Sequence, residues 1–551
     1  MTAMSGNGQP HDSASTSLKS SPSSLRDWLP ILCPYLLLAS VAPLLLFGCP
    51  TPSSPTPGGT GKTSPAESGA PPKTPGPKSN VIVDGWAKPA IAMILSGEIH
   101  GYMEPCGCDA NQSGGLSRRA DLFKQLKDKG WSVVGLDLGG TLKNARRQSQ
   151  IKFKFIHSAI SELGYKALGI GPEELHLGVD SLFSLGDAAK QNVGQTQLTS
   201  SNVIFYGSRD LGVPAEIIVF EENGVKVGVI SVLGDSYKKE ILPAGASNDL
   251  LSIESMKDSL GSAIEKLKAE KPQLTVFLSH ARPAETKQLL ETFPNTFNVA
   301  MTAGGIEDPY KDPEIIGGTM VVEVGQKGKK VGVVAYYPEA EQKLKFERIQ
   351  LDNKRFSKTK AMEDAMRYYQ ERLKEEAIAE TEPAISHPSG TTFVGSQSCG
   401  DCHTKAFAKW KSTKHGSKSW ASLVANDRSG MPGDPITRIY DPECLACHTT
   451  GWDPQEMIRY ESGYLNTTVS MHLTEQGCEN CHGPGKRHDE LERAFKQSGN
   501  RTEELLAERK VMHKDRANAE QQICIKCHDP ENSPNFNFDK YWLEVWHPYK
   551  D

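Results

Sequence analysis

The chain has 551 residues, with 62 Lys and Arg against 67 Asp and Glu, which gives a formal net charge of −5. This length predicts more than one domain, at about 100–200 residues each. The near balance of charge leaves no basic excess, so the composition does not indicate a nucleic-acid partner.

The first 49 residues predict an export signal. Lys19 and Arg26 precede an apolar stretch at 28–47, and three prolines interrupt that stretch. Prolines disfavour a membrane-spanning helix and favour a cleaved signal. The stretch ends in Leu-Phe-Gly-Cys49, which resembles the bacterial lipobox, where cleavage precedes a lipid-modified cysteine. We expect lipidation at Cys49 and a membrane-anchored protein at the periplasmic face or cell surface. An uncleaved anchor and ordinary secretion are the alternatives.

Residues 50–80 are dominated by Pro, Ser, Thr and Gly and show no apolar periodicity. Such a composition cannot bury enough apolar surface to form a core. As a flexible coil, the segment spans roughly 30 Å. We expect it to be a linker that holds the following domains away from the membrane.

Residues 88–350 alternate short apolar runs with amphipathic helical patterns. This alternation predicts an α/β domain with its own core. The expected strands include 90–95, 131–138, 225–233, 274–278 and 330–337, and the expected helices include 120–129, 153–163, 253–267 and 284–292. A charged helical stretch follows within 358–385, and we expect it to connect this domain to the C-terminal segment.

Several motifs of this domain resemble the 5′-nucleotidase-like calcineurin-type metallophosphoesterases. The sequence Ser-Gly-Glu98-Ile-His100-Gly is similar to the first metal motif of that family, Asn-Asp-x-His-Gly. The stretches 114–119, 163–168 and 278–280 follow in the order of the family. The resemblance implies a four-layer sandwich of two sheets flanked by helices.

The metal ligands that this family requires are mostly replaced. Glu98 stands where the family has Asp, and Gly140 replaces the Asp of the next motif. Pro172 and Glu173 take the positions of an Asn and a His, and a Gly-His-x-His motif reads Gly304-Gly305-Ile306-Glu307. The clear survivors are His100 and His280. A dinuclear phosphoesterase centre needs the missing ligands. We therefore expect little phosphoesterase activity, with an active phosphoesterase as the alternative.

Two cysteines follow His100 closely, in the sequence Glu104-Pro-Cys106-Gly-Cys108. They are candidate catalytic residues, because paired thiols form a reducible disulfide, attack a sulfur or metalloid substrate, or bind a soft metal. A metal site would combine them with His100 and His280. Two ordinary loop thiols are the alternative. The loop also resembles that of exported nucleotidase-like proteins, some of which carry selenocysteine, and this favours a redox role.

The segment 391–551 contains four Cys-x-x-Cys-His motifs, the attachment signature of c-type haem. Zinc ribbons and thioredoxin-like dithiols use Cys-x-x-Cys too, but the histidine repeated four times disfavours both. Each cysteine pair would bind one haem through thioethers, and the histidine would be the proximal iron ligand. The cysteines are Cys399, Cys402, Cys444, Cys447, Cys478, Cys481, Cys524 and Cys527, and the histidines are His403, His448, His482 and His528. We expect four covalent haem c groups, which are attached outside the cytoplasm.

The C-terminal segment resembles the cytochrome c-554 family of multihaem electron carriers. The resemblance rests on Trp410 with His415, on the third motif extended by Gly-Pro-Gly and His488, and on Trp-His547-Pro. It implies distal iron ligands at His415, His488 and His547, with one haem that lacks a distal ligand. His472 and His513 match no family position. Long apolar runs are scarce here, so we expect the haems to form the core of a mainly α domain.

The favoured interpretation is an exported, membrane-tethered tetrahaem cytochrome that passes electrons to redox partner proteins and carries a degenerate phosphoesterase-like domain. The alternative is a multihaem oxidoreductase, in which Cys106 and Cys108 or an open haem act on a small sulfur or nitrogen compound.

Overall fold

The computed structural model describes residues 81–105, 112–242, 249–424 and 437–547. The described residues lie in one compact unit. The predictions made for residues 1–80, which include lipidation at Cys49, and for Cys106 and Cys108 concern residues outside these ranges. In the ranges described, no helix is both long enough and apolar enough to span a membrane.

The first six-stranded sheet has β1 near its centre. Ala92 of β1 lies opposite Val133 of the parallel strand β2 and Ala335 of the antiparallel strand β13. All residues of β1 and β2 are buried, as expected for strands covered on both faces. The strand order is β14(Leu344–Gln350), β13(Lys330–Tyr336), β1(Ile91–Ser96), β2(Val133–Asp137), β3(Tyr165–Gly169), β4(Gln197–Thr199).

A second six-stranded sheet packs against the first. Its inner face contributes Val227 and Val276 to a core that also contains Met93 and Leu95 of β1. Neighbouring residues of a strand point to opposite faces, so Ile94 belongs to a different cluster, on the helical side. The strand order is β11(Glu314–Ile316), β12(Thr319–Val322), β10(Val299–Thr302), β9(Leu274–His280), β7(Val225–Leu233), β6(Ile217–Glu222).

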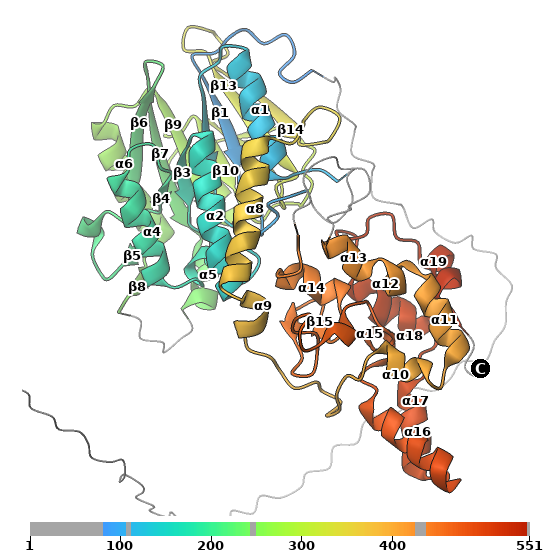
Figure 1. Ribbon diagram of the computed structural model, residues 1–551. Helices are drawn as coiled ribbons and strands as arrows, with labels where there is room; N and C mark the ends of the chain where they lie inside the picture. The colour runs from blue at the N-terminus through green and yellow to red at the C-terminus, as the bar shows by residue number, and fades with distance from the viewer. Residues whose placement is uncertain (1–80, 106–111, 243–248, 425–436, 548–551) are drawn as a thin grey trace, which may run out of the picture. The chain divides into compact units, whose positions relative to one another are not determined.

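Helices cover the outer face of each sheet (Figure 1). On the first sheet lie α1(Leu116–Asp128), α2(Arg147–Leu163) and α8(Lys360–Glu375). On the second lie α6(Met256–Ala269) and α7(Pro283–Thr292). The helix–sheet–sheet–helix order confirms the predicted four-layer α/β sandwich. Helix α8 falls in the stretch expected to be a connector. It buries an apolar stripe, so it also belongs to the outer layer of this domain.

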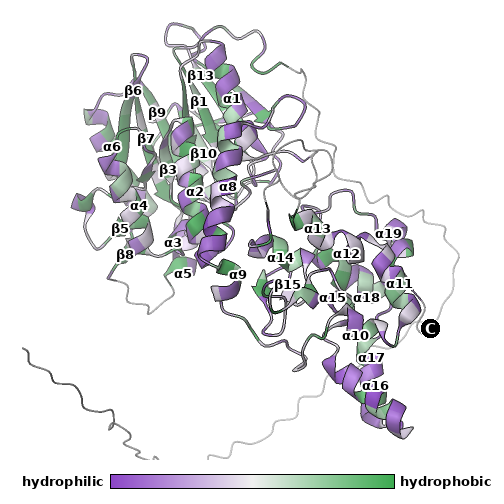
Figure 2. Cartoon of the chain, in the orientation of Figure 1, coloured by the Kyte–Doolittle hydropathy of each residue, from purple (hydrophilic) through white to green (hydrophobic). Residues whose placement is uncertain are grey.

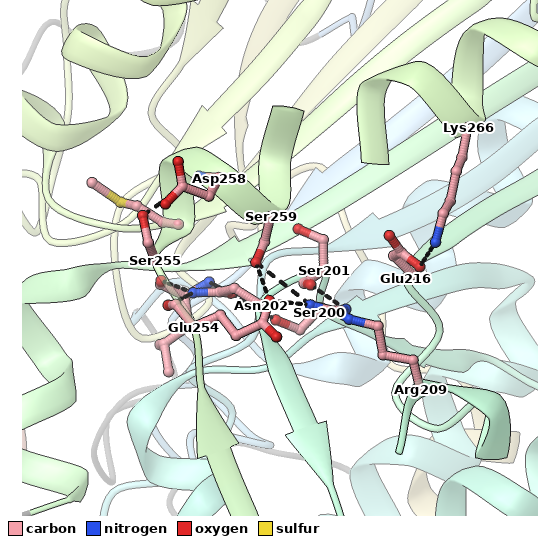
Figure 3. Close-up of polar contacts among 12 residues, drawn as sticks. Ser200, Ser201, Asn202, Arg209, Glu216, Glu254, Ser255, Asp258, Ser259 and Lys266 are labelled. Carbon is pink, nitrogen blue, oxygen red and sulfur yellow. Dashed lines mark hydrogen bonds and ion pairs between the residues drawn. The ribbon is translucent and has the colours of Figure 1, made fainter. Parts of the chain in front are cut away.

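A polar cluster links the end of β4, the edge strand of the first sheet, to the end of β7 in the second sheet (Figure 3). The buried side chain of Asn202 follows β4 of the first sheet. It donates to the carbonyl of Leu233 at 2.8 Å and accepts from the Leu233 amide at 2.9 Å. Leu233 ends β7 and pairs with His280 at the end of β9. Asn202 therefore fixes the strand ends at which His280 lies.

The C-terminal part is a set of short helices with little regular sheet, as predicted. Its apolar core is small and centres on Leu445, Trp452 and Tyr464. Figure 2 shows hydrophobic strands in the α/β domain and a strongly hydrophilic α16. Helices α11, α16 and α19 bury no residue. The helices include α10(Ser396–Gly400), α11(Thr404–Ser412), α12(Lys414–Ser417), α13(Ser419–Val424), α14(Pro442–His448), α15(Cys478–His482), α16(Lys486–Ser498), α17(Glu503–Met512) and α19(Phe538–Val545).

Candidate functional site

The first cysteine of each Cys-x-x-Cys-His motif lies in a short helical turn. The motifs belong to α10, α14, α15 and the 3₁₀ turn η4(Cys524–Lys526). In a helical turn, residues three apart lie on the same side. The two cysteines of a motif therefore face one region of space, and the following histidine starts beside them.

Three motif histidines face the three histidines expected to be distal ligands. The ring centres of His403 and His488 are 6.2 Å apart. The distance is 5.9 Å both between His482 and His547 and between His528 and His415. With metal–imidazole bonds of about 2 Å, two rings on opposite sides of one iron would have their centres about 6 Å apart. The three pairs therefore have the spacing that bis-histidine coordination requires.

Hydrogen bonds at Nδ1 orient several of these rings. Nδ1 of His482 lies 2.7 Å from the Met512 carbonyl, and Nδ1 of His448 lies 2.9 Å from the Ser419 carbonyl. Nδ1 of His528 lies 3.0 Å from Ser533 Oγ. A histidine that donates from Nδ1 leaves Nε2 for a metal. These contacts therefore suit the motif histidines to the proximal position.

Burial also keeps several of these imidazoles neutral. It lowers the pKa of His415 to about 4, with a further contribution from the nearby His528. Burial likewise lowers the pKa of His482, His488 and His528. Neutral imidazole is the form that binds a metal. Within the described residues, Nδ1 of His488 is a buried atom with no hydrogen-bond partner.

The four motifs follow one another in space in an order that differs from the sequence. The thiols of Cys399 and Cys478 interact directly, which joins the first motif to the third. Cys481 lies near Cys524 of the fourth motif. In turn, Cys527 interacts with Cys447 of the second motif. Groups attached to the motifs would follow the order first, third, fourth, second.

A cavity of about 840 Å³ lies among the second, third and fourth motifs. Cysteines and histidines of these motifs line it, together with His415. A large cavity beside a small apolar core, with paired thiols and facing imidazoles on its wall, suits porphyrin groups. The described residues therefore fit covalent haem, which would supply one-electron redox chemistry. The other two spare histidines lie elsewhere: the ring of His472 packs near Gly395, and His513 follows α17.

Glu479 is a residue of this region that the sequence analysis missed, although it lies inside the third motif. Its side chain is buried, and its carboxylate accepts from the amides of Val394, Gly395 and Gly485 at 2.7–3.2 Å. Gly395 is the N-cap of α10, which carries the first motif. Glu479 therefore ties the first motif to the third. Asp401 and Lys526 also lie between haem cysteines, so the sequence alone did not single out Glu479.

In the α/β domain, the strand ends bring His100, His280, Glu98 and Glu173 together. Nε2 of His100 lies 4.0 Å from Glu98, and Nδ1 of His100 lies 3.9 Å from Glu173. Glu98 and His100 both have left-handed backbones, with φ of 47° and 45°. Such conformations are unfavourable for residues other than glycine and recur at functional sites.

Burial dominates the electrostatics of this cluster. It raises the pKa of Glu98 to about 7, and it raises the pKa of Glu173 to about 8 with help from the negative charge of Glu174. Burial lowers the pKa of His100 and of His280. Burial therefore favours the neutral forms of both the carboxyls and the imidazoles of this cluster.

The His280 ring lies close to Gly140 and Gly171, which belong to two of the altered metal motifs. A Cβ atom at Gly140 would lie 3.2 Å from the His280 ring, and one at Gly171 would lie 2.5 Å from it. A side chain at either glycine would therefore compete with the His280 ring for space. Across the described ranges, no three His, Cys, Asp or Glu side chains are arranged to hold a metal ion. A metal at His100 and His280 with Cys106 and Cys108 remains a prediction, because both cysteines lie outside those ranges.

Comparison with known proteins identifies the class of the C-terminal part first. Residues 398–483 match the family described as cytochrome c554 and c-prime. A match to a c-type cytochrome family implies covalent haem and redox partners.

A particular relative is cytochrome c-554 of Nitrosomonas europaea, which is 31% identical over 121 residues. That alignment covers 20% of this chain and 48% of the relative, so the chain spans about half the length of the curated relative it matches.

Among solved structures, the chain is similar to a 5′-nucleotidase precursor from Thermus thermophilus. The identity is 19%, the TM-score is 0.44, and the match covers 54% of this chain and 60% of the other. It is also similar to the calcineurin-like phosphoesterase YfkN from Bacillus subtilis. Here the identity is 16%, the TM-score is 0.40, and the match covers 52% of this chain and 98% of the other.

Proposed function

We propose that this protein is an exported, membrane-tethered tetrahaem cytochrome that carries electrons between redox partner proteins. The observation that carries the proposal is the spacing of the three histidine pairs, which suits irons ligated on both faces. The haems would bind at Cys399 and Cys402, Cys444 and Cys447, Cys478 and Cys481, and Cys524 and Cys527. Their proximal ligands would be His403, His448, His482 and His528.

The neighbouring thiols support electron transfer through the whole segment. Because each motif has a cysteine close to a cysteine of the next motif in space, the attached haems would form one continuous row. The Cys49 lipid anchor and the linker at 50–80 are part of the proposal and rest on the sequence. They would hold this row near a membrane surface, where donor and acceptor proteins can reach it.

The distal ligands provide the direct test. We expect four haems per chain by the pyridine haemochrome assay, with mainly low-spin spectra, because bis-histidine ligation gives a strong ligand field. His488→Ala should convert one of the four haems to a high-spin form in electron paramagnetic resonance spectra. It should leave the haem count at four, because the attachment cysteines and His403 are unchanged.

His513→Ala is the matched control, because His513 is a histidine of the same segment that was not assigned to an iron. Its spectrum should remain that of the wild type. Two or fewer haems per wild-type chain would contradict the cytochrome assignment. Four haems with an unchanged His488→Ala spectrum would remove only His488 from the ligand set.

The α/β domain should be a poor phosphoesterase. Glycines stand at positions where this fold needs ligands, and the His280 ring fills the space beside Gly140 and Gly171. We expect nucleotide hydrolysis close to the background rate with Mn²⁺, Mg²⁺ or Zn²⁺ added. Metal-dependent turnover that disappears in His100→Ala would show that the centre is active after all.

A second candidate function is oxidation or binding of a small sulfur compound at Cys106 and Cys108. The observation that favours it is that residues 101–105 line the same cavity as Cys444, Cys447 and Cys527. We expect both thiols to be alkylated in the reduced protein and protected after oxidation, as measured by mass spectrometry. Thiols that never change with redox state would leave the plain electron carrier.

A further inference from the structure

The helix that carries the second haem motif is held by side chains of the α/β domain. Asp441 caps the N-terminus of α14 by accepting from the Glu443 amide. Its two carboxylate oxygens also accept from Gln148 of α2 at 2.8 Å and from Gln370 of α8 at 2.7 Å. Gln148 donates as well to Tyr369 Oη at 2.9 Å. The side chains of Asp441, Gln148, Gln370 and Tyr369 are all buried.

An ion pair lies one helical turn along α2 from this contact. Lys152 follows Gln148 by four residues, so both lie on the same face of the helix. The ammonium group of Lys152 pairs with the carboxylate of Glu443, the residue before Cys444. The Lys152 side chain is only 5% exposed, whereas that of Glu443 is 38% exposed. The lysine charge is therefore largely removed from water.

The same residues form part of the wall of the 840 Å³ cavity. Lys152, Tyr369 and Glu443 line it together with Cys444 and Cys447, the attachment cysteines of the second motif. A further contact joins the two parts at this wall, because Arg438 pairs with Glu104 at 2.8 Å. The α/β domain thus contributes charged and polar groups to the surroundings of the second motif.

We infer that the α/β domain keeps the reduction potential of the haem attached at Cys444 and Cys447 from falling, because Lys152 neutralises the charge of Glu443 beside that haem. This inference rests on the proposed function, since it requires a haem at this motif. Lys152 is a positioning residue: it acts on the haem pocket through its charge and its hold on α14, and it takes no part in attachment. The α/β domain would then regulate an electron carrier without needing a metal centre of its own.

The physical basis is electrostatic. Reduction of a haem iron removes one unit of positive charge, so a nearby cation stabilises the reduced state and a nearby anion destabilises it. Both effects are stronger in a protein interior than in water. In the wild type the charges of Lys152 and Glu443 compensate each other. Removing either partner leaves the other uncompensated, and the two removals should act in opposite directions.

The test is a spectroelectrochemical titration of the full-length protein, with electron paramagnetic resonance to resolve the haems. In Lys152→Met we expect one of four midpoint potentials to fall, with the reduction equilibrium changing about tenfold, or about 59 mV for one electron. In Glu443→Gln we expect the same haem to shift upward. The double variant Lys152→Met/Glu443→Gln should return close to the wild-type potential, and Lys152→Arg should retain it.

Lys226→Met is the matched control, because Lys226 forms a lysine–glutamate pair with Glu270 on the exposed surface of the same domain. Its four potentials should equal those of the wild type. The haem count is measured first: two or fewer haems per wild-type chain would overturn the proposed function. Four haems with no opposite shifts in Lys152→Met and Glu443→Gln would overturn this inference alone. If Lys152→Met does not fold, Glu443→Gln alone tests the inference: an upward shift of one potential supports it, and no shift overturns it.

Discussion

Cys481→Ala is expected to leave three properly attached haems and to destabilise the whole C-terminal segment. The cysteine lies at the middle of the row of motifs, near Cys524, while Cys478 of the same motif contacts Cys399. The apolar core of the segment is small, so the missing haem contacts have few side chains to replace them. We expect a loss of several kcal/mol, on the scale at which cofactor binding is coupled to folding.

The measurement combines the mass of the haem-loaded chain with thermal unfolding followed at the haem absorption band. Cys106→Ala is the control, because it removes a thiol that lies outside the four motifs. It should keep four haems and the wild-type transition temperature. A Cys481→Ala protein with the full stability of the wild type would show that the segment folds on its side chains, and not around haem.

The stability of the α/β domain is expected to fall as the pH rises from about 6.5 to about 8. Below that range the lowered pKa values of His100 and His280 act in the opposite direction. Glu98 and Glu173 have pKa values of about 7 and about 8 in the folded protein, both raised mainly by burial. A carboxyl with a raised pKa makes its full contribution to folding stability when the pH is below its unfolded pKa of about 4.5. That contribution is lost as the pH passes through the folded pKa. At about 1.4 kcal/mol per pKa unit, the whole shift of Glu98 is worth about 3 kcal/mol, spread over the range from its unfolded pKa to its folded pKa.

Denaturant unfolding followed by circular dichroism at each pH, with the haem band recorded separately, measures this dependence. Glu173→Gln and Glu98→Gln should each flatten the profile and stabilise the domain at pH 8, because an amide cannot ionise. Glu265→Gln is the control, since Glu265 is an exposed carboxyl on α6 of the same domain. A wild-type profile that is flat between pH 6.5 and 8 would contradict the raised pKa values.

Some properties of this protein follow from short stretches of sequence. A haem attachment motif occupies five consecutive residues, so its chemistry can be recognised without any knowledge of the fold. An α/β domain was also predictable, because apolar runs of strand length alternate with helical patterns over a long segment. Its four-layer arrangement was implied only by the resemblance of its motifs to the metallophosphoesterases. The motifs that carry the resemblance to cytochrome c-554 are also local in sequence. Comparison with known proteins confirmed that resemblance.

Only the tertiary structure determined how these local features combine. His403 lies near His488, and Lys152 pairs with Glu443, although the two residues of each pair are far apart in sequence. Neither contact therefore has a local sequence pattern that predicts it. The same holds for the spatial order of the motifs and for the His280 ring beside Gly140. The raised pKa values of Glu98 and Glu173 come from burial, which depends on every element packed around a side chain. The sequence by itself therefore determined which groups this protein carries, whereas long-range packing decided which of them act on one another.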